Sequence, residues 1–218
     1  MQAILFDWDG TLVDSLGAFH RANATVMQAF GLAFDEVLYR RHYVPDWRLM
    51  YLRLGVPDDR LDEANELWHA TYGNGSEVVA FNGVADALAS LNEAGSRLGI
   101  VTAGDRHVVV PQMERTGLAH LLSIRVFGDD LPVHKPDPAP LRLALTKLGL
   151  EHRPGDVAYV GDAPTDMQMA RSVGVHAIGI TSVIGDPNEL REAGAAEVAS
   201  SVVDWTARHL ASIPGRAR

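Results

Sequence analysis

Short runs of apolar residues recur along the chain and predict buried β-strands. The runs are Ala3–Phe6, Leu98–Thr102, Ile124–Phe127, Val157–Val160 and His176–Ile180. Continuous apolar runs of this length are typical of parallel strands, which helices cover on both faces.

Helical patterns separate most of these strands. Apolar positions recur at helical spacing in three segments, at Val84–Leu91, Leu141–Leu148 and Ala163–Val173. Each segment is followed by a glycine, which is a common helix stop. Strands that alternate with helices predict an α/β fold, here a Rossmann-like parallel sheet with right-handed crossovers.

Residues 105–117 are also expected to be helical, although Pro111 lies among them. Proline lacks an amide proton and clashes with the preceding turn, but it is tolerated in the first turn of a helix. We therefore expect that the helix either starts near Val110 or is kinked there.

Residues 16–81 interrupt the alternation of strands and helices. Their apolar positions predict helices at Leu16–Phe30, Trp47–Leu54 and Leu61–Trp68, with a loop at Tyr43–Arg48. We predict that residues 16–81 form an all-helical cap domain, inserted into a core domain made of residues 1–15 and 82–218. Open α/β sheets bind ligands at the carboxyl ends of their strands, and we expect the cap to face this edge.

Composition and charge limit the partners. The 218 residues are 47% hydrophobic and 22% charged, which is ordinary for a globular protein. The net charge of −9 disfavours nucleic acid, and an anionic substrate would need a metal ion or a few cationic side chains close by. There is no cysteine, and the chain has neither a signal-peptide pattern nor an apolar run of membrane-spanning length. We expect a cytoplasmic protein that contacts no membrane, and the oligomeric state stays open.

Two aspartates follow the first predicted strand, in the sequence Asp7-Trp8-Asp9-Gly10-Thr11. Side chains alternate along a strand, so Asp7 and Asp9 point the same way and Trp8 points away. Neighbouring carboxylates repel each other unless a cation lies between them or one is protonated. An ordinary turn rich in Asp and Gly is an equally good interpretation of this segment alone.

Two further segments carry groups that bind anions. Thr102, at the end of the second predicted strand, is followed by Ala103 and Gly104, which offer a hydroxyl and open backbone amides. Lys135 stands in the proline-stiffened segment Lys135-Pro136-Asp137-Pro138, just before a helix. Taken alone, a buried structural threonine and a solvated surface lysine are the simpler interpretations.

A second acidic segment follows the strand at Val157–Val160. Asp162 comes directly after Gly161, and Asp166 follows four positions later. Asp162 could simply cap the following helix, with Pro164 in its first turn. Capping does not explain why the acids of both segments fall at strand ends. The four segments together place acids, a lysine and a hydroxyl at one sheet edge, as phosphoryl transfer requires.

The four segments resemble the motifs of the haloacid dehalogenase-like hydrolase superfamily, in the same order. Phe6–Ser15 is similar to the first motif, Val101-Thr102 to the second, Lys135–Pro138 to the third, and Gly161-Asp162 with Asp166 to the fourth. The resemblance covers nearly the whole chain. It is strongest to the phosphatases that resemble phosphoglycolate phosphatase and have a helical cap after the first motif. Trp8 departs from the family, which more often has an aliphatic residue there.

The resemblance implies a Mg²⁺-dependent phosphatase that hydrolyses a small phosphorylated metabolite. Asp7 would attack phosphorus and form an aspartyl-phosphate, and Asp9 would protonate the leaving oxygen and then deprotonate the hydrolytic water. The Mg²⁺ ligands would be Asp7, the backbone carbonyl of Asp9 and Asp162. Asp166 would support the ion directly or through water.

The resemblance also implies the phosphate-binding groups. Thr102 and the amide of Ala103 would bind the phosphate, and Lys135 would pair with both Asp7 and the phosphate. In the cap, Arg48 is a candidate contact to a second anionic group of the substrate, because the adjacent Trp47 and Pro45 limit its freedom. Arg48 paired with an acid or lying on a solvent-exposed helix face is an equally good interpretation.

The superfamily that this chain resembles also contains enzymes with other activities. Dehalogenases lack the second acid of the first motif, so Asp9 argues against them. Phosphonate-cleaving enzymes need a lysine in the cap, and residues 16–81 contain none. Sugar-phosphate mutases share Asp7 and Asp9 and remain an alternative, although Thr11 favours a phosphatase. A non-catalytic binding protein of the same fold would usually lack Asp7 or Lys135.

Overall fold

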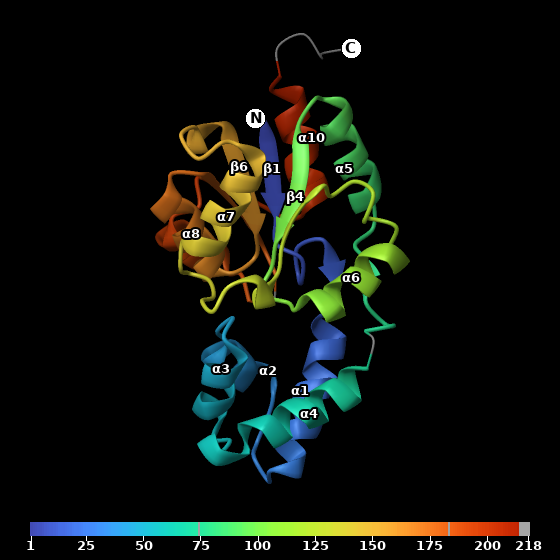
Figure 1. The fold of residues 1–218 in the computed structure, drawn as a ribbon, viewed down its shortest axis with the longest axis vertical. Coiled ribbons are helices and arrows are strands. Elements are labelled where there is room, and N and C mark those ends of the chain that lie inside the picture. Colours follow the sequence, from blue (N-terminus) through green and yellow to red (C-terminus); the bar gives the residue numbers. More distant parts are fainter. Residues whose placement is uncertain (74, 183, 214–218) are drawn as a thin grey trace. The chain divides into compact units, whose positions relative to one another are not determined.

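The computed structural model describes residues 1–73, 75–182 and 184–213. It divides into two compact units (Figure 1). One consists of Met1–Asp14 with Val79–Arg218, and the other of Ser15–Val78.

A parallel six-stranded sheet forms the centre of the first unit among the described residues, in the order β5-β4-β1-β6-β7-β8. The strands are β1 (Ala3–Phe6), β4 (Arg97–Val101), β5 (Ile124–Val126), β6 (Val157–Gly161), β7 (His176–Ile180) and β8 (Glu197–Ala199). The five strands predicted from apolar runs are all present, to within one residue at each end, and β8 is an addition. The prediction of a parallel α/β sheet is confirmed.

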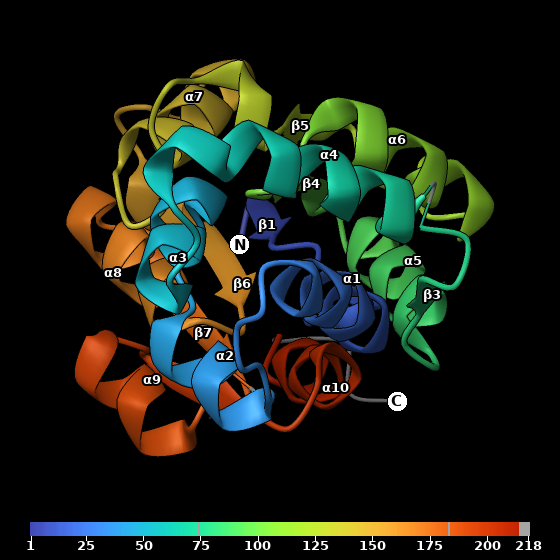
Figure 2. The same ribbon diagram turned by 90° about the horizontal axis from the view of Figure 1, so that it is seen from below.

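Helices cover both faces of this sheet (Figure 2). The helices of this unit are α5 (Val84–Glu93), α6 (Arg106–Arg115), α7 (Ala139–Leu148), α8 (Pro164–Val173), α9 (Pro187–Ala193) and α10 (Val202–Ala211). One face carries α7, α8 and α9, and the other carries α5 and α10. Alternate residues of β1 and β6, such as Leu5 and Tyr159, belong to the apolar core beneath α7 and α8.

Glycines end α7 and α8 as the sequence predicts. Gly149 and Gly174 follow these helices with φ of 66° and 81°. Glycine adopts this left-handed conformation without a steric penalty, and its amide then bonds the last carbonyls of the helix.

Helix α6 contains Pro111 in its interior and begins at Arg106. Of the two alternatives, a helix that starts near Val110 is therefore excluded, and Pro111 lies inside a helix that starts earlier. The proline ring removes one helical hydrogen bond, yet the helix continues to Arg115 because Val109, Gln112 and Met113 are buried on the core side.

Two short strands lie where the chain passes between the units. Strand β2 (Val13–Asp14) pairs antiparallel with β3 (Val79–Ala80). Asp14 lies opposite Val79, so the two chain segments that connect the units run side by side.

All regular elements of the second unit, among its described residues, are helices. It contains α1 (Leu16–Ala29), α2 (Glu36–His42), α3 (Trp47–Leu54), a short 3₁₀ helix at Asp58–Arg60 and α4 (Leu61–Tyr72). Helix α1 packs along α4, where Phe19 lies 5.6 Å from Trp68 and 5.2 Å from Tyr72 between ring centres. Helix α2 was not predicted from the apolar pattern. The expected loop at Tyr43–Arg48 is shorter than predicted, because Asp46 caps α3 and the helix begins at Trp47.

Candidate active site

Adjacent strands place Asp7, Thr102 and Asp162 at one edge of the sheet. Strand β1 lies between β4 and β6, with Phe6 in register with Ile100 and Val160. Asp7 directly follows β1, and its amide donates to the Val160 carbonyl at 2.8 Å. The carboxyl ends of three neighbouring strands therefore bring together residues from three of the four sequence motifs.

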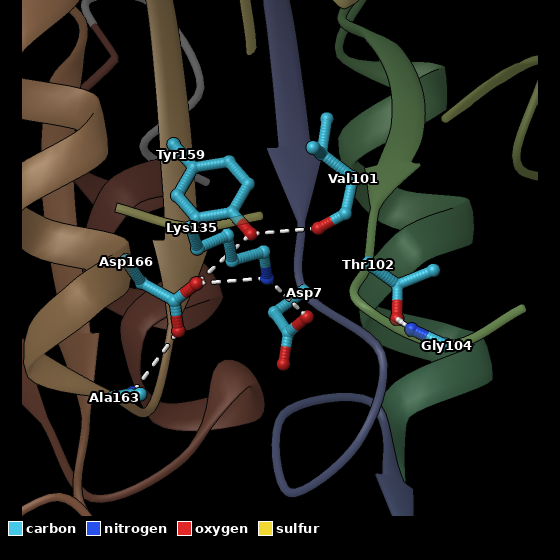
Figure 3. A network of polar contacts seen from close by, with 8 residues as sticks. All are labelled: Asp7, Val101, Thr102, Gly104, Lys135, Tyr159, Ala163 and Asp166. Atoms are coloured by element: carbon cyan, nitrogen blue, oxygen red, sulfur yellow. Dashed lines mark hydrogen bonds and ion pairs between the residues drawn. The ribbon is translucent and has the colours of Figure 1, made fainter. Parts of the chain in front are cut away.

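Lys135 brings in the remaining motif. Its ammonium group lies 2.5 Å from Asp7 Oδ1 and 2.8 Å from Asp166 Oδ1 (Figure 3). The lysine is 6% exposed and lies over the ring of Tyr159, 5.4 Å from its centre. The surface-lysine interpretation is excluded, because this ammonium group is buried between two carboxylates.

Asp166 holds both Lys135 and the start of α8. Its Oδ2 accepts from the Ala163 amide at 3.0 Å, while its Oδ1 faces Lys135 and the Tyr159 hydroxyl. A Cβ at Gly161 would lie 2.5 Å from Asp166 Oδ2, so a glycine is required there. These contacts make Asp166 a support for Lys135 as much as a candidate metal ligand.

Tyr159 is a member of this network that the sequence analysis missed. Its hydroxyl donates to the Val101 carbonyl at 2.7 Å and lies 3.2 Å from Asp166 Oδ1. The side chain is fully buried, and it joins the end of β4 to α8 (Figure 3). The available signal was a tyrosine in an otherwise aliphatic strand, since a buried hydroxyl needs a partner.

Three buried carboxylates converge at this edge. Oxygens of Asp7, Asp162 and Asp166 lie within 4.8 Å of one another. Burial raises the pKa of Asp7 to about 7, although Lys135 opposes the shift. Burial and the nearby Asp7 and Asp166 also raise the pKa of Asp162 well above its ordinary value.

Lys135 balances part of this charge. Burial alone would lower the pKa of Lys135, but Asp166 and Asp7 raise it above its ordinary value, so the lysine stays protonated. One ammonium group cannot neutralise three carboxylates. The excess negative charge and the oxygen-only donor set fit a hard divalent cation such as Mg²⁺.

The loop after β4 carries the predicted phosphate-binding groups. Thr102 is 4% exposed, and its hydroxyl oxygen accepts from the Gly104 amide at 3.0 Å, which leaves its proton to donate elsewhere. The Gly128 amide donates to the Gly104 carbonyl at 2.9 Å. A Cβ at Gly128 would lie 2.1 Å from the Ala103 carbonyl oxygen, so the backbone at Gly128 packs tightly against this loop.

Asp9 and Trp8 diverge as strand alternation predicts. Trp8 is fully buried and donates from its indole nitrogen to Gln112 Oε1 on α6 at 2.8 Å. The Asp9 carboxylate lies beside the loop after β4, where its Oδ2 would be 3.6 Å from a Cβ at Gly104. Asp9 also raises the pKa of Asp7, which places the two carboxylates in the same electrostatic environment.

Comparison with known proteins agrees with this geometry. A family model described as haloacid dehalogenase-like hydrolase matches residues 4–180. The chain belongs to this family. The match spans the residues that resemble all four motifs and includes the helical unit.

Curated relatives of this haloacid dehalogenase-like hydrolase include phosphatases. The plasmid phosphoglycolate phosphatase of Cupriavidus necator is 34% identical over 181 residues, which cover 79% of this chain and 78% of the relative. The phosphoglycolate phosphatase of Rhodospirillum rubrum is 34% identical over 187 residues, which cover 80% and 77%. The predicted class of enzyme, a phosphatase-type hydrolase, is confirmed.

Solved structures of the family share the fold. A protein from Bacteroides fragilis, described as a haloacid dehalogenase-like hydrolase, has a TM-score of 0.85 at 25% identity, covering 94% of this chain and 99% of that one. A protein from Thermotoga maritima, described as a β-phosphoglucomutase, has a TM-score of 0.76 at 24% identity, covering 98% and 100%. This second likeness concerns the fold alone, because the same architecture supports both activities.

Arg48 belongs to the helical unit of this family member. Its guanidinium group lies 3.1 Å from Asp62 and 4.6 Å from the ring centre of Trp47, and 55% of its side chain is exposed. Asp46 accepts from the backbone amide of Arg48 as a helix cap. The structure therefore gives Arg48 an acidic partner on its own unit.

Among the residues that the structure describes, no helix is both long and apolar enough to cross a membrane.

Proposed function

We propose that this chain is a Mg²⁺-dependent phosphatase that hydrolyses a small phosphate monoester through an aspartyl-phosphate on Asp7. The observation that carries the proposal is the placement of Asp7. Its carboxylate is buried and forms an ion pair with Lys135, and one of its oxygens lies within 4.8 Å of oxygens of Asp162 and Asp166. Asp7, the Asp9 backbone carbonyl and Asp162 would hold Mg²⁺, with Asp166 as support.

The first half of the reaction forms the intermediate. An oxygen of Asp7 attacks phosphorus, and the bond from phosphorus to the leaving oxygen breaks. Lys135 holds the Asp7 carboxylate in place, while the Thr102 hydroxyl and the Ala103 amide donate to phosphate oxygens. When bound, Mg²⁺ supplies the positive charge that allows a carboxylate to approach a phosphate anion.

The second half releases phosphate. Asp9 donates its proton to the leaving alcohol during the first half and is then a carboxylate. In the second half it takes a proton from the water that attacks the phosphorus of the aspartyl-phosphate. The bond between phosphorus and Asp7 breaks, inorganic phosphate leaves, and both aspartates return to their starting state.

The helical unit Ser15–Val78 is the proposed cap domain that selects the substrate. The curated relatives named above are phosphoglycolate phosphatases, which makes 2-phosphoglycolate the first candidate substrate. Arg48 would bind a carboxylate of such a substrate with two parallel hydrogen bonds, in exchange for its pair with Asp62.

A panel of phosphate esters tests this proposal. Purified enzyme is assayed for phosphate release with Mg²⁺ and in chelator, using 2-phosphoglycolate, sugar phosphates and an aryl phosphate. We expect release that requires Mg²⁺ and is lost in Asp7→Asn, whose amide is nearly isosteric but is not a nucleophile. Full activity in chelator or in Asp7→Asn would contradict the mechanism. Conversion of a sugar 1-phosphate to its 6-phosphate without phosphate release would identify a mutase instead.

A further inference from the structure

Ser182 follows strand β7 and contacts a carboxylate of the candidate active site. Its hydroxyl oxygen lies 2.6 Å from Asp162 Oδ2. Strands β7 and β6 are neighbours, with Gly179 in register with Gly161, so the two residues come from adjacent strand ends. None of the four sequence motifs includes Ser182.

The direction of the Ser182 proton follows from its other contacts. The hydroxyl oxygen accepts from the amides of Ile184 and Gly185, each at 3.0 Å. A serine hydroxyl has two acceptor positions and one proton. Both acceptor positions are occupied by amides, so the proton points to Asp162. The distance is typical of a hydroxyl that donates to a carboxylate.

This hydrogen bond divides the two oxygens of Asp162 between different partners. Oδ2 faces Ser182 and packs against Gly10, where a Cβ would lie 2.4 Å away. Oδ1 does not take part in this hydrogen bond, so it would be the oxygen offered to a cation. A Cβ at Gly185 would lie 2.2 Å from the backbone oxygen of Asp162, so the backbone of Asp162 is closely packed against this turn.

The turn itself does not need this proton. The Ser182 amide donates to the Gly185 carbonyl at 3.3 Å, and the hydroxyl oxygen stabilises the turn as an acceptor. Donation from the hydroxyl therefore serves Asp162.

We infer that Ser182 is a positioning residue that orients Asp162 so that Oδ1 is presented to Mg²⁺. The inference rests on the proposed function, which makes Asp162 a metal ligand. Groups that hydrogen-bond a metal ligand typically change metal affinity 10- to 100-fold when removed, roughly. Ser182 therefore acts on metal binding, and it does not touch the reacting atoms.

Calorimetry of Mg²⁺ binding to the purified full chain tests the inference. In Ser182→Ala, the Kd for Mg²⁺ should rise about 10- to 100-fold, while kcat at saturating Mg²⁺ stays close to that of the wild type. Ser182→Thr keeps the hydroxyl and should restore the affinity. Ser123→Ala is the matched control, because the Ser123 hydroxyl donates to a backbone carbonyl, that of Leu98, at 3.2 Å.

The outcomes separate this inference from the proposed function. If the wild type binds Mg²⁺ and Ser182→Ala binds it equally well, the positioning role is wrong and the phosphatase proposal stands. If the wild type binds no Mg²⁺, both are overturned. Should Ser182→Ala not fold, Ser182→Cys replaces it, since a thiol is a weak donor of similar size. An unchanged Kd in Ser182→Cys would then overturn the inference.

Discussion

The raised pKa of Asp7 makes the metal-free protein less stable as the pH rises. Burial raises this pKa from 3.8 to about 7, although Lys135 opposes the shift. In the unfolded chain the same carboxyl group ionises near its ordinary pKa. Between about pH 4 and about pH 7, the folded protein therefore holds a proton that the unfolded chain has lost, and the free energy of unfolding falls as the pH rises.

The size of this effect follows from the two pKa values. Roughly three pH units, at about 1.4 kcal/mol each, correspond to about 4 kcal/mol. Asp7→Asn removes the titrating group and should remove this loss. Replacing Asp7 also breaks its ion pair with Lys135, which adds an offset to the comparison of wild type and variant. The part of this offset that comes from Lys135 varies little over this pH range, because Lys135 stays protonated. Asp7 also helps to raise the pKa of Asp162, so Asp7→Asn removes that contribution as well and widens the difference between the two proteins.

Urea unfolding in chelator at about pH 5 and about pH 8 measures the change in unfolding free energy for both proteins. Only about two pH units of this assay, from about pH 5 to about pH 7, lie inside the window, so we expect the wild type to lose about 2.7 kcal/mol more than Asp7→Asn between these two conditions. Excess Mg²⁺ should abolish most of the wild-type loss, because the cation replaces the proton. Parallel losses in the two proteins would show that Asp7 does not hold the raised pKa.

Three further predictions address other residues of the two units. Asp9→Asn should slow both formation and breakdown of the intermediate, and its effect on formation should be largest for substrates with poor leaving groups. Pre-steady-state kinetics in which good and poor leaving groups suffer equally in the formation step would contradict the acid role. Arg48→Ala should lower kcat/KM at least about tenfold for a substrate that carries a second anionic group, and it should barely change kcat/KM for an aryl phosphate, which lacks that group. Asp62→Ala should free Arg48 and lower KM for the first substrate. Equal losses on both substrates would mean that Arg48 only supports the fold of the helical unit. Gly128→Ala should reduce stability by about 1–3 kcal/mol in thermal unfolding, because its Cβ would overlap the Ala103 carbonyl, and an unchanged melting temperature would contradict the packing argument.

The sheet was predictable because its central strands are buried on both faces. Strands such as β1 and β6 are continuous apolar runs, and their residues are fully buried. Strand β8 has three residues, begins with the exposed Glu197, and lies at an edge of the sheet. Such a short segment has no distinctive period, so its sequence alone does not separate it from a loop.

The part of the candidate site that could be predicted consists of residues that directly follow a strand. Asp7, Thr102 and Asp162 follow strands that alternate with helices, and parallel topology brings such ends together. The roles of Tyr159 and Ser182 were not predictable in the same way. Each depends on where a single hydroxyl proton points, and that direction is set by the register of neighbouring strands and by backbone amides.

The antiparallel pairing of β2 with β3 has a consequence for the engineering of this chain. Asp14 and Val79 are paired across an antiparallel ladder, so both ends of the helical unit leave the core at almost the same point. Paired strands are separated by about 5 Å, which a two-residue turn can close. Residues 15–78 can thus be excised and replaced by Asn-Gly, or exchanged for another module whose ends lie equally close. The core would keep its chain order and its sheet, so the helical unit could be exchanged without a change to the strands that carry Asp7, Thr102 and Asp162.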